Sequence, residues 1–586
     1  MRGNGSRNAV LWMLLAIGPI TLGCYSHGAN LTPVPTPPAV GLPKCTAPLV
    51  DTSGGPVCGL RVPGADQVPP TGATVDAYLG IRYGDDAGRW EYATLHRGSK
   101  STTATAFGEE CAHAQLGGKK ISGSEDCFFV NVWTPADRGR ELLPVLAFVP
   151  GGGFIIGGTN GAVTQGWQVA AAGKVVVVTF NYRLGAFGGL GGGHGKNELR
   201  GDYGFADQQL ALQWIQENVA SFGGDPGRVT LWGESSGAQS VALHLVAPGS
   251  RDLFRAAILE SNPYGLPYKD TKSQVEVVRV AFDLAATRAA HVDCGWRGDL
   301  DCLKKMTTSQ VIEAQAGTGF LPVLVERLRG ALAWSPLVGT ERIPIQPIDV
   351  ELSKPTLLGT NLEEGLQFAE LGLANRKELS RKEYDLVLFL LLGLDDLHKV
   401  IARERYKPGA EGVPGSGEKT FSALQNVFTD YLWTCPNRRV LRRAKVDDWG
   451  YFFVHGPSYN VWPLFPGCTG LPCHSYELPF TFRRPYLFEE ELVLKGFTPQ
   501  ELLLSDRMSQ FWIRFAEIGD PNRDDQPPWP RFAATSPGER FIMNLPEYDT
   551  QGLLTQDENA NCDLWDEIGY GNPAPIFKAG RRDSRP

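Results

Sequence analysis

A serine between glycines is the first candidate for chemistry in this sequence. Gly233-Glu234-Ser235-Ser236-Gly237 matches the G-x-S-x-G pattern, in which a serine stands at a sharp turn between a strand and a helix. The run GRVTLW at 227–232 is typical of a buried strand, and AQSVALHLV at 238–246 is typical of a helix. The pattern therefore predicts a nucleophile for acyl transfer at Ser235, with its hydroxyl exposed by the turn.

A second glycine run could stabilise the negative charge that develops on a substrate carbonyl. Gly151-Gly152-Gly153-Phe154 follows LPVLAFV at 143–149, which predicts another strand. Glycine has no Cβ, so its backbone N–H can approach a substrate closely, as an oxyanion requires. A plain flexible turn would have the same composition. The glycine cluster at 184–195 matches neither phosphate-binding pattern, because Leu190 and His194 occupy required glycine positions.

A general base must be found among only nine histidines. His244 lies on the apolar stretch after the serine, and His455 ends a strand-like run, so packing in the core is the simpler interpretation for both. His474 lies on a loop that a disulfide between Cys468 and Cys473 would stiffen. This setting favours His474 as the base. Spacing alone does not select the orienting acid among 64 acidic residues.

The cysteine count indicates an oxidising compartment. There are 11 cysteines, and setting Cys24 aside leaves an even number that could form five disulfides. No repeated C-x-x-C and no His–Cys cluster with zinc spacing is present, so no metal site is expected. Four pairs are close in sequence, and the remaining pair would close a long loop: Cys45 and Cys58, Cys111 and Cys127, Cys294 and Cys302, Cys468 and Cys473, and Cys435 and Cys562.

The elements needed to position these residues are those of an α/β protein. KVVVVTFN at 174–181 is a nearly continuous β-branched run, typical of a strand buried on both faces of a parallel sheet. Apolar residues then recur at helical spacing over 207–219. This alternation predicts an α/β fold with a mostly parallel central sheet and helices on both faces. Longer helical patterns at 273–288 and 376–405 predict helical cap excursions over the carboxyl edge of the sheet, where ligands bind in such folds.

Charge and the chain ends limit the partners and the compartment. The net charge of −8 disfavours nucleic acid as a partner. Residues 1–24 combine a basic start, a short apolar run and Cys24, which predicts a signal peptide, either of ordinary type or of a lipoprotein type that would attach Cys24 to a membrane. Residues 25–43 predict a Pro-rich tether, 44–575 one catalytic domain and 576–586 a disordered polar tail. We therefore expect an exported protein that is secreted, periplasmic or at the cell surface.

Several recognisable segments follow one another along the expected catalytic domain: LGIRY at 79–83, SEDCFFVNV at 124–132, NYRLG at 181–185, FGGDP at 222–226, FWIRFA at 511–516 and GDPN at 519–522. In this order they resemble segments of the type-B carboxylesterases, the α/β-hydrolase family that includes cholinesterases and neuroligins. The resemblance extends over nearly the whole expected catalytic domain and implies the α/β-hydrolase fold.

The resemblance implies a catalytic triad of Ser235, Glu364 and His474. GTNLEEG at 359–365 matches the family's G-x-N-x-x-E-G, in which the acid precedes the last glycine, and Glu363 is the fallback. His474 stands in the family's H-x-Y-E-[LI]-x-F setting, although a serine follows it where the family has glycine. The order Ser, acid, His is that of the α/β-hydrolases.

The resemblance also implies the residues around the triad. Gly152, Gly153 and the N–H of Ser236 would form the oxyanion hole. Glu234 would lie near the site and position water or His474, or serve as a buried structural acid. Three of the cysteine pairs match the family's bridges: Cys111–Cys127, Cys294–Cys302 and Cys435–Cys562. The loop closed by the first of these is short and has no tryptophan to stack on a quaternary ammonium, so choline specificity is not expected.

The expected activity is hydrolysis of small to medium carboxylic esters through an acyl-enzyme intermediate. A small-molecule ester is the expected partner, and no cofactor is expected. Activity should rise through about pH 6–7 as His474 loses its proton. The alternatives are a catalytically silent, neuroligin-like binding or adhesion module, and a lipase or polyester hydrolase. Silent members typically lose a triad residue, whereas Ser235, Glu364 and His474 are all present.

Overall fold

The structure is a computed structural model that describes residues 45–570, except 65–70, 116–119, 271, 296–298, 320–321, 323–330, 373–376, 411–412, 486–495, 523–528, 533–538, 544–551 and 554–555. The predicted signal peptide at 1–24 with Cys24, the tether at 25–43 and the tail at 576–586 lie outside the described residues. Within the described ranges, no helix is long and apolar enough to cross a membrane.

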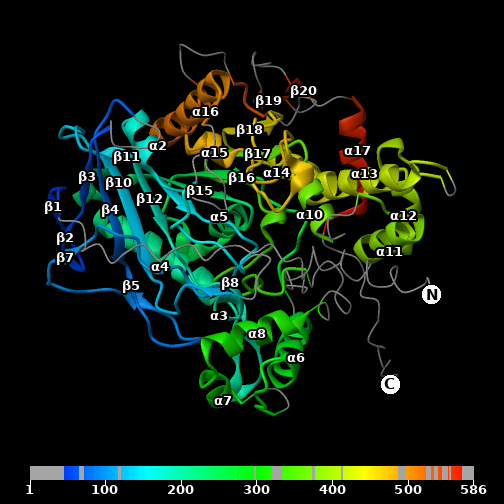
Figure 1. The fold of residues 1–586 in the computed structure, drawn as a ribbon, viewed down its shortest axis with the longest axis horizontal. Helices are drawn as coiled ribbons and strands as arrows, with labels where there is room; N and C mark the ends of the chain where they lie inside the picture. Colours follow the sequence, from blue (N-terminus) through cyan, green and yellow to red (C-terminus); the bar gives the residue numbers. More distant parts are fainter. Residues whose placement is uncertain are drawn as a thin grey trace.

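A mixed β-sheet forms the centre of the described chain (Figure 1). It has 11 strands among the described residues, in the order β20-β19-β18-β17-β16-β15-β11-β12-β10-β4-β3. The mostly parallel sheet expected from the sequence is confirmed. The parallel strands are β11 (Leu143–Val149), β12 (Val176–Phe180), β15 (Gly224–Glu234), β16 (Ala256–Glu260), β17 (Thr356–Asn361), β18 (Asp448–Phe453) and β19 (Glu539–Met543). Antiparallel strands extend the sheet on both sides: β10 (Phe129–Pro135), β4 (Val75–Arg82) and β3 (Leu60–Val62) on one, β20 (Gly552–Leu553) on the other.

Helices cover both faces of this sheet, as predicted. Successive side chains of a strand point to opposite faces, so β11 sends Leu146 and Phe148 into one core and Val145 and Ala147 into the other. The first core is covered by α2 (Trp167–Ala172) and α16 (Pro499–Ile518), and the second by α4 (Tyr203–Asn218), α5 (Ser236–Val246) and α14 (Cys435–Arg442). Every residue of β11 is buried, which explains its continuous apolar run.

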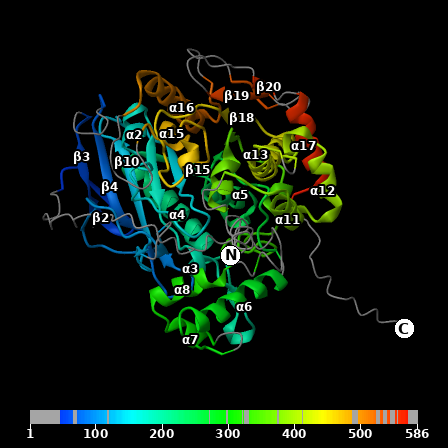
Figure 2. The ribbon, with the colours of Figure 1, turned by 45° about the vertical axis from the view of Figure 1, so that its right-hand side comes forward.

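The longer helical patterns of the second half form helices outside the sheet. The pattern at 273–288 is α6 (Lys272–Arg288), which packs on α8 (Thr308–Thr318) and lies with α7 (Leu300–Lys304) below the sheet in Figures 1 and 2. The pattern at 376–405 contains α11 (Arg381–Leu392) and α12 (Leu394–Ile401). These two lie beside α10 (Glu364–Gly372) and α13 (Ser416–Phe428), beyond the sheet in Figure 1.

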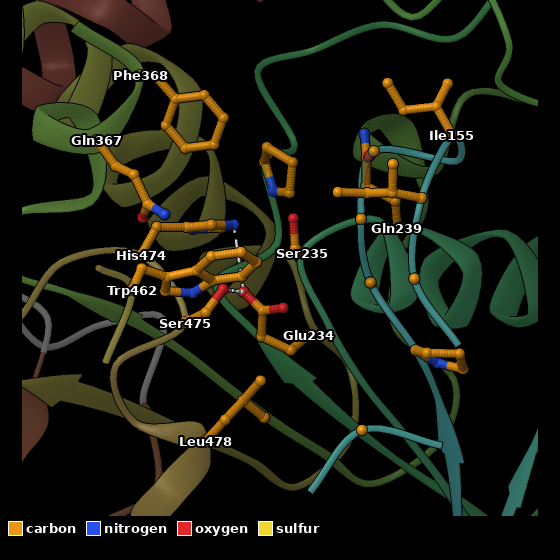
Figure 3. Close-up of a pocket in the computed structure, with 18 of the residues that line it drawn as sticks. Ile155, Glu234, Ser235, Gln239, Gln367, Phe368, Trp462, His474, Ser475 and Leu478 are labelled. Carbon is orange, nitrogen blue, oxygen red and sulfur yellow. Dashed lines mark hydrogen bonds and ion pairs between the residues drawn. The ribbon is translucent and has the colours of Figure 1, made fainter. Parts of the chain in front are cut away.

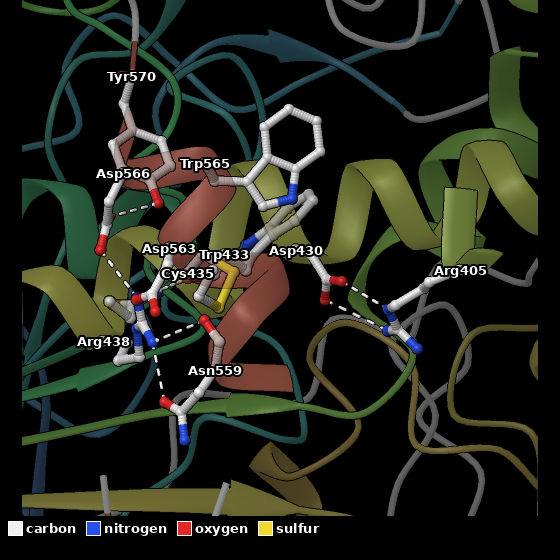
Figure 4. Close-up of a disulfide and its surroundings, with 12 residues drawn as sticks. Arg405, Asp430, Trp433, Cys435, Arg438, Asn559, Asp563, Trp565, Asp566 and Tyr570 are labelled. Atoms are coloured by element: carbon white, nitrogen blue, oxygen red, sulfur yellow. Dashed lines mark hydrogen bonds and ion pairs between the residues drawn. A yellow bond between two sulfur atoms is a disulfide. The ribbon is translucent and has the colours of Figure 1, made fainter. Parts of the chain in front are cut away.

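The ten cysteines of the described chain pair as predicted. The pair with the greatest sequence separation, 127 residues, joins α14 to α17 (Gln556–Ile568) (Figure 4). Next to it, the buried guanidinium of Arg438 lies 2.7 Å from a carboxylate oxygen of Asp563 and 2.9 Å from one of Asp566. A covalent bond and two ion pairs therefore connect these two helices. The five disulfides are Cys45–Cys58, Cys111–Cys127, Cys294–Cys302, Cys435–Cys562 and Cys468–Cys473.

Candidate active site

Ser235 stands at the turn between β15 and α5. Its backbone, with φ 56° and ψ −124°, adopts a conformation that residues other than glycine rarely adopt. A Cβ added to Gly233 would lie 2.5 Å from the carbonyl carbon of Gly237, and one added to Gly237 would lie 2.1 Å from the carbonyl oxygen of Val149. Both glycines of the pentapeptide are therefore required for the strand and the helix to meet this closely, and the resulting turn presents Ser235 to a cavity.

The glycine loop forms the wall of this cavity nearest to the serine. A Cβ on Gly151 would lie 3.2 Å from the Cβ of Ser235, which shows how closely the loop approaches it. Gly152 and Gly153 have φ values of 111° and 64°, a region that favours glycine. The N–H of the next residue, Phe154, donates a hydrogen bond of 3.3 Å to Oγ of Ser236. The side chain of Ser236 thus ties the loop to the first turn of α5.

His474 and Glu364 meet on another side of the same cavity. Nδ1 of His474 lies 2.6 Å from Oε2 of Glu364, and Oε1 of Glu364 accepts a 2.7 Å hydrogen bond from the N–H of Asn361. Both side chains are buried. The fallback acid, Glu363, accepts a hydrogen bond from Gln425 instead. The structure therefore brings Glu364, not Glu363, onto the imidazole.

The second imidazole nitrogen faces the cavity (Figure 3). Nε2 of His474 is buried and has no hydrogen-bond partner among the described residues. Ser235 and His474 line one cavity but are not hydrogen-bonded to each other, and such contacts often tighten only when substrate is bound. The nearest acid is Glu234, whose Oε1 lies 3.2 Å from Nε2. The arrangement can therefore accept a proton at Nε2 from a group that enters the cavity.

Glu234 and Glu364 change the titration of this histidine. Burial by itself would lower the pKa of His474, but the negative charges of Glu234 and Glu364 raise it to about 9. Burial raises the pKa of Glu234 to about 7, opposed by the charge of His474 and by the hydroxyl of Ser475, which donates to its Oε1 at 2.6 Å. The expectation that His474 loses its proton near pH 6–7 is therefore wrong, because adjacent carboxylates hold the proton to higher pH.

Two further buried glutamates, to which the sequence analysis assigned no role, lie behind the site. Burial and the charges of Glu234 and Glu364 raise the pKa of Glu477 to about 8, and its Oε1 accepts a 3.2 Å hydrogen bond from Ser261. Burial also raises the pKa of Glu260, which accepts a 2.5 Å hydrogen bond from an indole N–H. Glu260 ends β16 and Glu477 lies three residues after the histidine. Two features of the sequence could have identified these glutamates: Glu260 ends the short apolar run that forms β16, and Glu477 belongs to the motif around His474.

The two histidines assigned to the core are packed as expected. His244 stacks on Phe205, its two ring nitrogens bond Ser250 at 2.8 Å and Gln208 at 3.1 Å, and burial lowers its pKa to about 3. His455 lies 3.3 Å from a carboxylate oxygen of an acid on α16. Neither lines the cavity at Ser235. Within the described residues, no three His, Cys, Asp or Glu side chains are grouped as ligands of a metal ion.

The cavity itself is largely apolar and has a volume of about 340 Å³. The imidazole of His474 packs against two aromatic side chains, with ring centroids 5.1 Å from Phe368 and 5.4 Å from Trp433. Such walls exclude water and leave orientation to a few polar groups. Other apolar residues of the lining are Ile155, Ile156, Leu266, Trp334, Trp462 and Leu478.

Comparison with known proteins agrees with this arrangement. An acetylcholinesterase from Bungarus fasciatus is 30% identical over 560 residues, an alignment that covers 88% of this chain and 86% of the relative. An acetylcholinesterase from Danio rerio is 30% identical over 503 residues, which cover 76% of this chain and 74% of the relative. The protein named "Crystal protein" from Dictyostelium discoideum is 29% identical over 502 residues, which cover 84% of this chain and 85% of the relative.

A family model settles the classification. The model of the Carboxylesterase family matches residues 46–565, nearly the whole described chain. This match confirms the resemblance inferred from the ordered segments and, with the parallel sheet, the α/β-hydrolase fold. The chain belongs to the carboxylesterase family.

Proposed function

We propose that this protein is a serine carboxylic-ester hydrolase that acts on small to medium carboxylic esters through an acyl-enzyme intermediate. The observation that carries the proposal is the 2.6 Å contact between Nδ1 of His474 and Glu364, with Nε2 facing the cavity that Ser235 lines. A general base requires a buried acid on one imidazole nitrogen and a second nitrogen that faces the substrate cavity, and His474 has both.

In the acylation step, neutral His474 accepts the proton of Ser235 at Nε2 while Oγ attacks the ester carbonyl carbon. Glu364 holds the proton on Nδ1 and stabilises the imidazolium that forms. The backbone N–H groups of Gly152, Gly153 and Ser236 donate to the oxyanion, and each such donor contributes about 10²–10³-fold in rate. His474 then protonates the oxygen of the leaving alcohol, the carbon–oxygen bond breaks, and the acyl group remains on Oγ.

In the deacylation step, water takes the place of the alcohol. His474 accepts a proton from this water, its oxygen attacks the acyl carbon, and the same N–H groups stabilise the second oxyanion. Collapse of this intermediate returns the proton to Oγ of Ser235 and releases the acid. Every proton in the cycle passes through Nε2 of His474, so the pKa of this residue controls the rate at low pH.

Hydrolysis of short-chain p-nitrophenyl esters by the purified protein and by Ser235→Ala tests the proposal. We expect turnover by the wild type, loss of turnover in Ser235→Ala, and covalent labelling of Ser235 by a fluorophosphonate, located by mass spectrometry. Equal rates for the two proteins would favour the silent binding or adhesion module. A series from acetate to long-chain emulsions and insoluble polyester separates a small-ester hydrolase from a lipase or polyester hydrolase.

We also propose that the enzyme acts outside the cytoplasm, with lipidation of Cys24 as one route to membrane attachment. Five disulfides support an oxidising compartment. Mass spectrometry of the mature N-terminus tests the attachment: a lipid-modified Cys24 supports it, and an unmodified terminus near that position indicates ordinary signal cleavage.

A further inference from the structure

Gln239 is a polar side chain of the cavity that the ester mechanism does not use. It follows Ser235 by one turn of α5 and is 2% exposed. Its amide nitrogen Nε2 is buried and has no hydrogen-bond partner among the described residues, although the residue lines the cavity. A buried amide N–H that is left unpaired destabilises the fold, and most such groups in proteins have a partner. An acceptor supplied by a ligand would satisfy it.

Two hydrogen bonds hold the backbone of Gln239 in place. Its N–H donates a 2.9 Å hydrogen bond to the carbonyl of Ser235, and its own carbonyl accepts a 2.8 Å hydrogen bond from the hydroxyl of Tyr268. Both main-chain polar groups of Gln239 are therefore already hydrogen-bonded within the protein. The carboxamide has two N–H donors, and these are what the residue can offer to a bound molecule.

Geometry assigns Gln239 to the acyl side of the cavity. The leaving alcohol must lie next to His474, because Nε2 protonates its oxygen. In Figure 3, Gln239 and Ile155 lie on the side of Ser235 away from His474, whereas Gln367 and Phe368 lie on the side of His474. With the acyl carbon bonded to Oγ and the alcohol at His474, the acyl chain extends toward Gln239 and Ile155.

We propose that Gln239 determines acyl specificity by donating a hydrogen bond to an oxygen of the acyl chain. The preferred esters carry an ether or carbonyl oxygen in the acyl group in place of a methylene. This inference rests on the proposed ester hydrolysis and names its substrate class. Because Gln239 lies one turn of α5 after Ser235, the oxygen belongs a few atoms beyond the carbonyl carbon, and the fourth atom of the chain is the position tested.

A pair of isosteric esters tests the proposal. p-Nitrophenyl 3-methoxypropanoate and p-nitrophenyl pentanoate have the same chain length, and the first has an oxygen where the second has its fourth carbon. The ratio of their kcat/KM values is measured for the wild type and for Gln239→Met, which keeps the size and removes the donors. The intrinsic reactivities of the two esters cancel between the proteins. We expect the ratio to fall about tenfold in Gln239→Met, the discrimination typical of one hydrogen bond.

Two further variants make the result specific. Gln239→Leu also removes the N–H donors and has no other hydrogen-bonding group, so the ratio should fall about as far. Gln367→Met alters a buried glutamine of the same cavity on the side of His474, and it should leave the acyl ratio unchanged. Each rate is divided by the rate of the same protein on p-nitrophenyl acetate, so a general loss of activity cancels.

The outcomes separate this inference from the proposed function. If the wild type hydrolyses all three esters and the ratio stays within twofold in Gln239→Met and in Gln239→Leu, the acyl role of Gln239 is overturned while the esterase stands. A fall of equal size in Gln367→Met would also overturn it. If the wild type hydrolyses none of the esters, both ideas fail. If Gln239→Met does not show the thermal unfolding transition of a folded protein, the ratio measured for Gln239→Leu decides.

Discussion

In the proposed mechanism, we predict that the carboxylate of Glu234 controls the pH at which the site becomes active. Its Oε1 lies 3.2 Å from Nε2 of His474, the nitrogen that must be deprotonated to accept the proton of Ser235. The negative charges of Glu234 and Glu364 raise the pKa of His474 to about 9 against the opposing effect of burial. A raised pKa of a general base moves the acid limb of the activity profile upward, so activity should increase through about pH 9 in the free enzyme.

Replacement of Glu234 by Gln removes one of these charges and keeps the shape of the side chain. At an effective dielectric constant of about 20, two unit charges 3.2 Å apart interact by about 5 kcal/mol. One pKa unit corresponds to about 1.4 kcal/mol, so the pair alone could shift the histidine by more than three units. In the variant, Glu364 still contacts Nδ1 and the imidazole is still buried. All the effects together raise the pKa of the wild-type histidine only from 6.5 to about 9. We therefore expect the acid limb to move down by about one to two pH units.

The measurement is kcat/KM for p-nitrophenyl acetate between pH 5 and pH 10, with Ser235→Ala as the blank for spontaneous hydrolysis. Glu363→Gln is the matched control, because its carboxylate contacts Gln425 and not His474, and its acid limb should coincide with that of the wild type. Ser475→Gly should shift the limb in the same direction as Glu234→Gln but by less, since Glu234 loses a donor that favours its charged form. An unchanged or higher midpoint in Glu234→Gln would refute the reasoning.

Three further predictions concern the parts that hold the site. Gly151→Ala would place a Cβ 2.7 Å from the backbone oxygen of Glu234, so it should lower kcat about 10²-fold and also lower the melting temperature. An unaltered kcat would contradict this prediction. Ser236→Ala removes the acceptor for the N–H of Phe154 and should lower kcat about three- to tenfold with little change in KM in steady-state assays. Replacing Cys435 and Cys562 by serine should lower the free energy of unfolding by about 4–5 kcal/mol in chemical denaturation, because the disulfide closes a 127-residue loop.

The central sheet could be predicted because its physics is local. A strand that is buried on both faces must be apolar throughout, and the run at 143–149 coincides with β11. The run at 174–181 is longer than β12 (Val176–Phe180), which leaves Lys174, Val175 and Asn181 outside the strand. The pentapeptide around Ser235 was informative for the same reason, because the clash that each glycine avoids lies within the turn or on the adjacent strand.

The local sequence pattern alone could not show which acid contacts His474. Glu363 and Glu364 are adjacent and chemically identical, and only the fold decides which of them faces His474. Glu364 begins α10 directly after β17, and its Oε1 accepts from the N–H of Asn361, which fixes the carboxylate at the end of the sheet. The resemblance to a family motif selected Glu364, which the structure places against His474, whereas the spacing of residues in the sequence selected no acid.

The titration of the site depends on groups that no local pattern connects. Ser475 stands where the family has glycine, a small change in sequence terms, yet its hydroxyl donates to Glu234 across a separation of 241 residues. Through Glu234, this hydroxyl acts on the proton of His474, so a residue outside the triad helps to determine when the triad can work. A pKa sums desolvation and every nearby charge, and those contributions come from segments that meet only after folding. The residues proposed for catalysis could therefore be named from the sequence, whereas the pH at which His474 loses its proton is a property of the folded site.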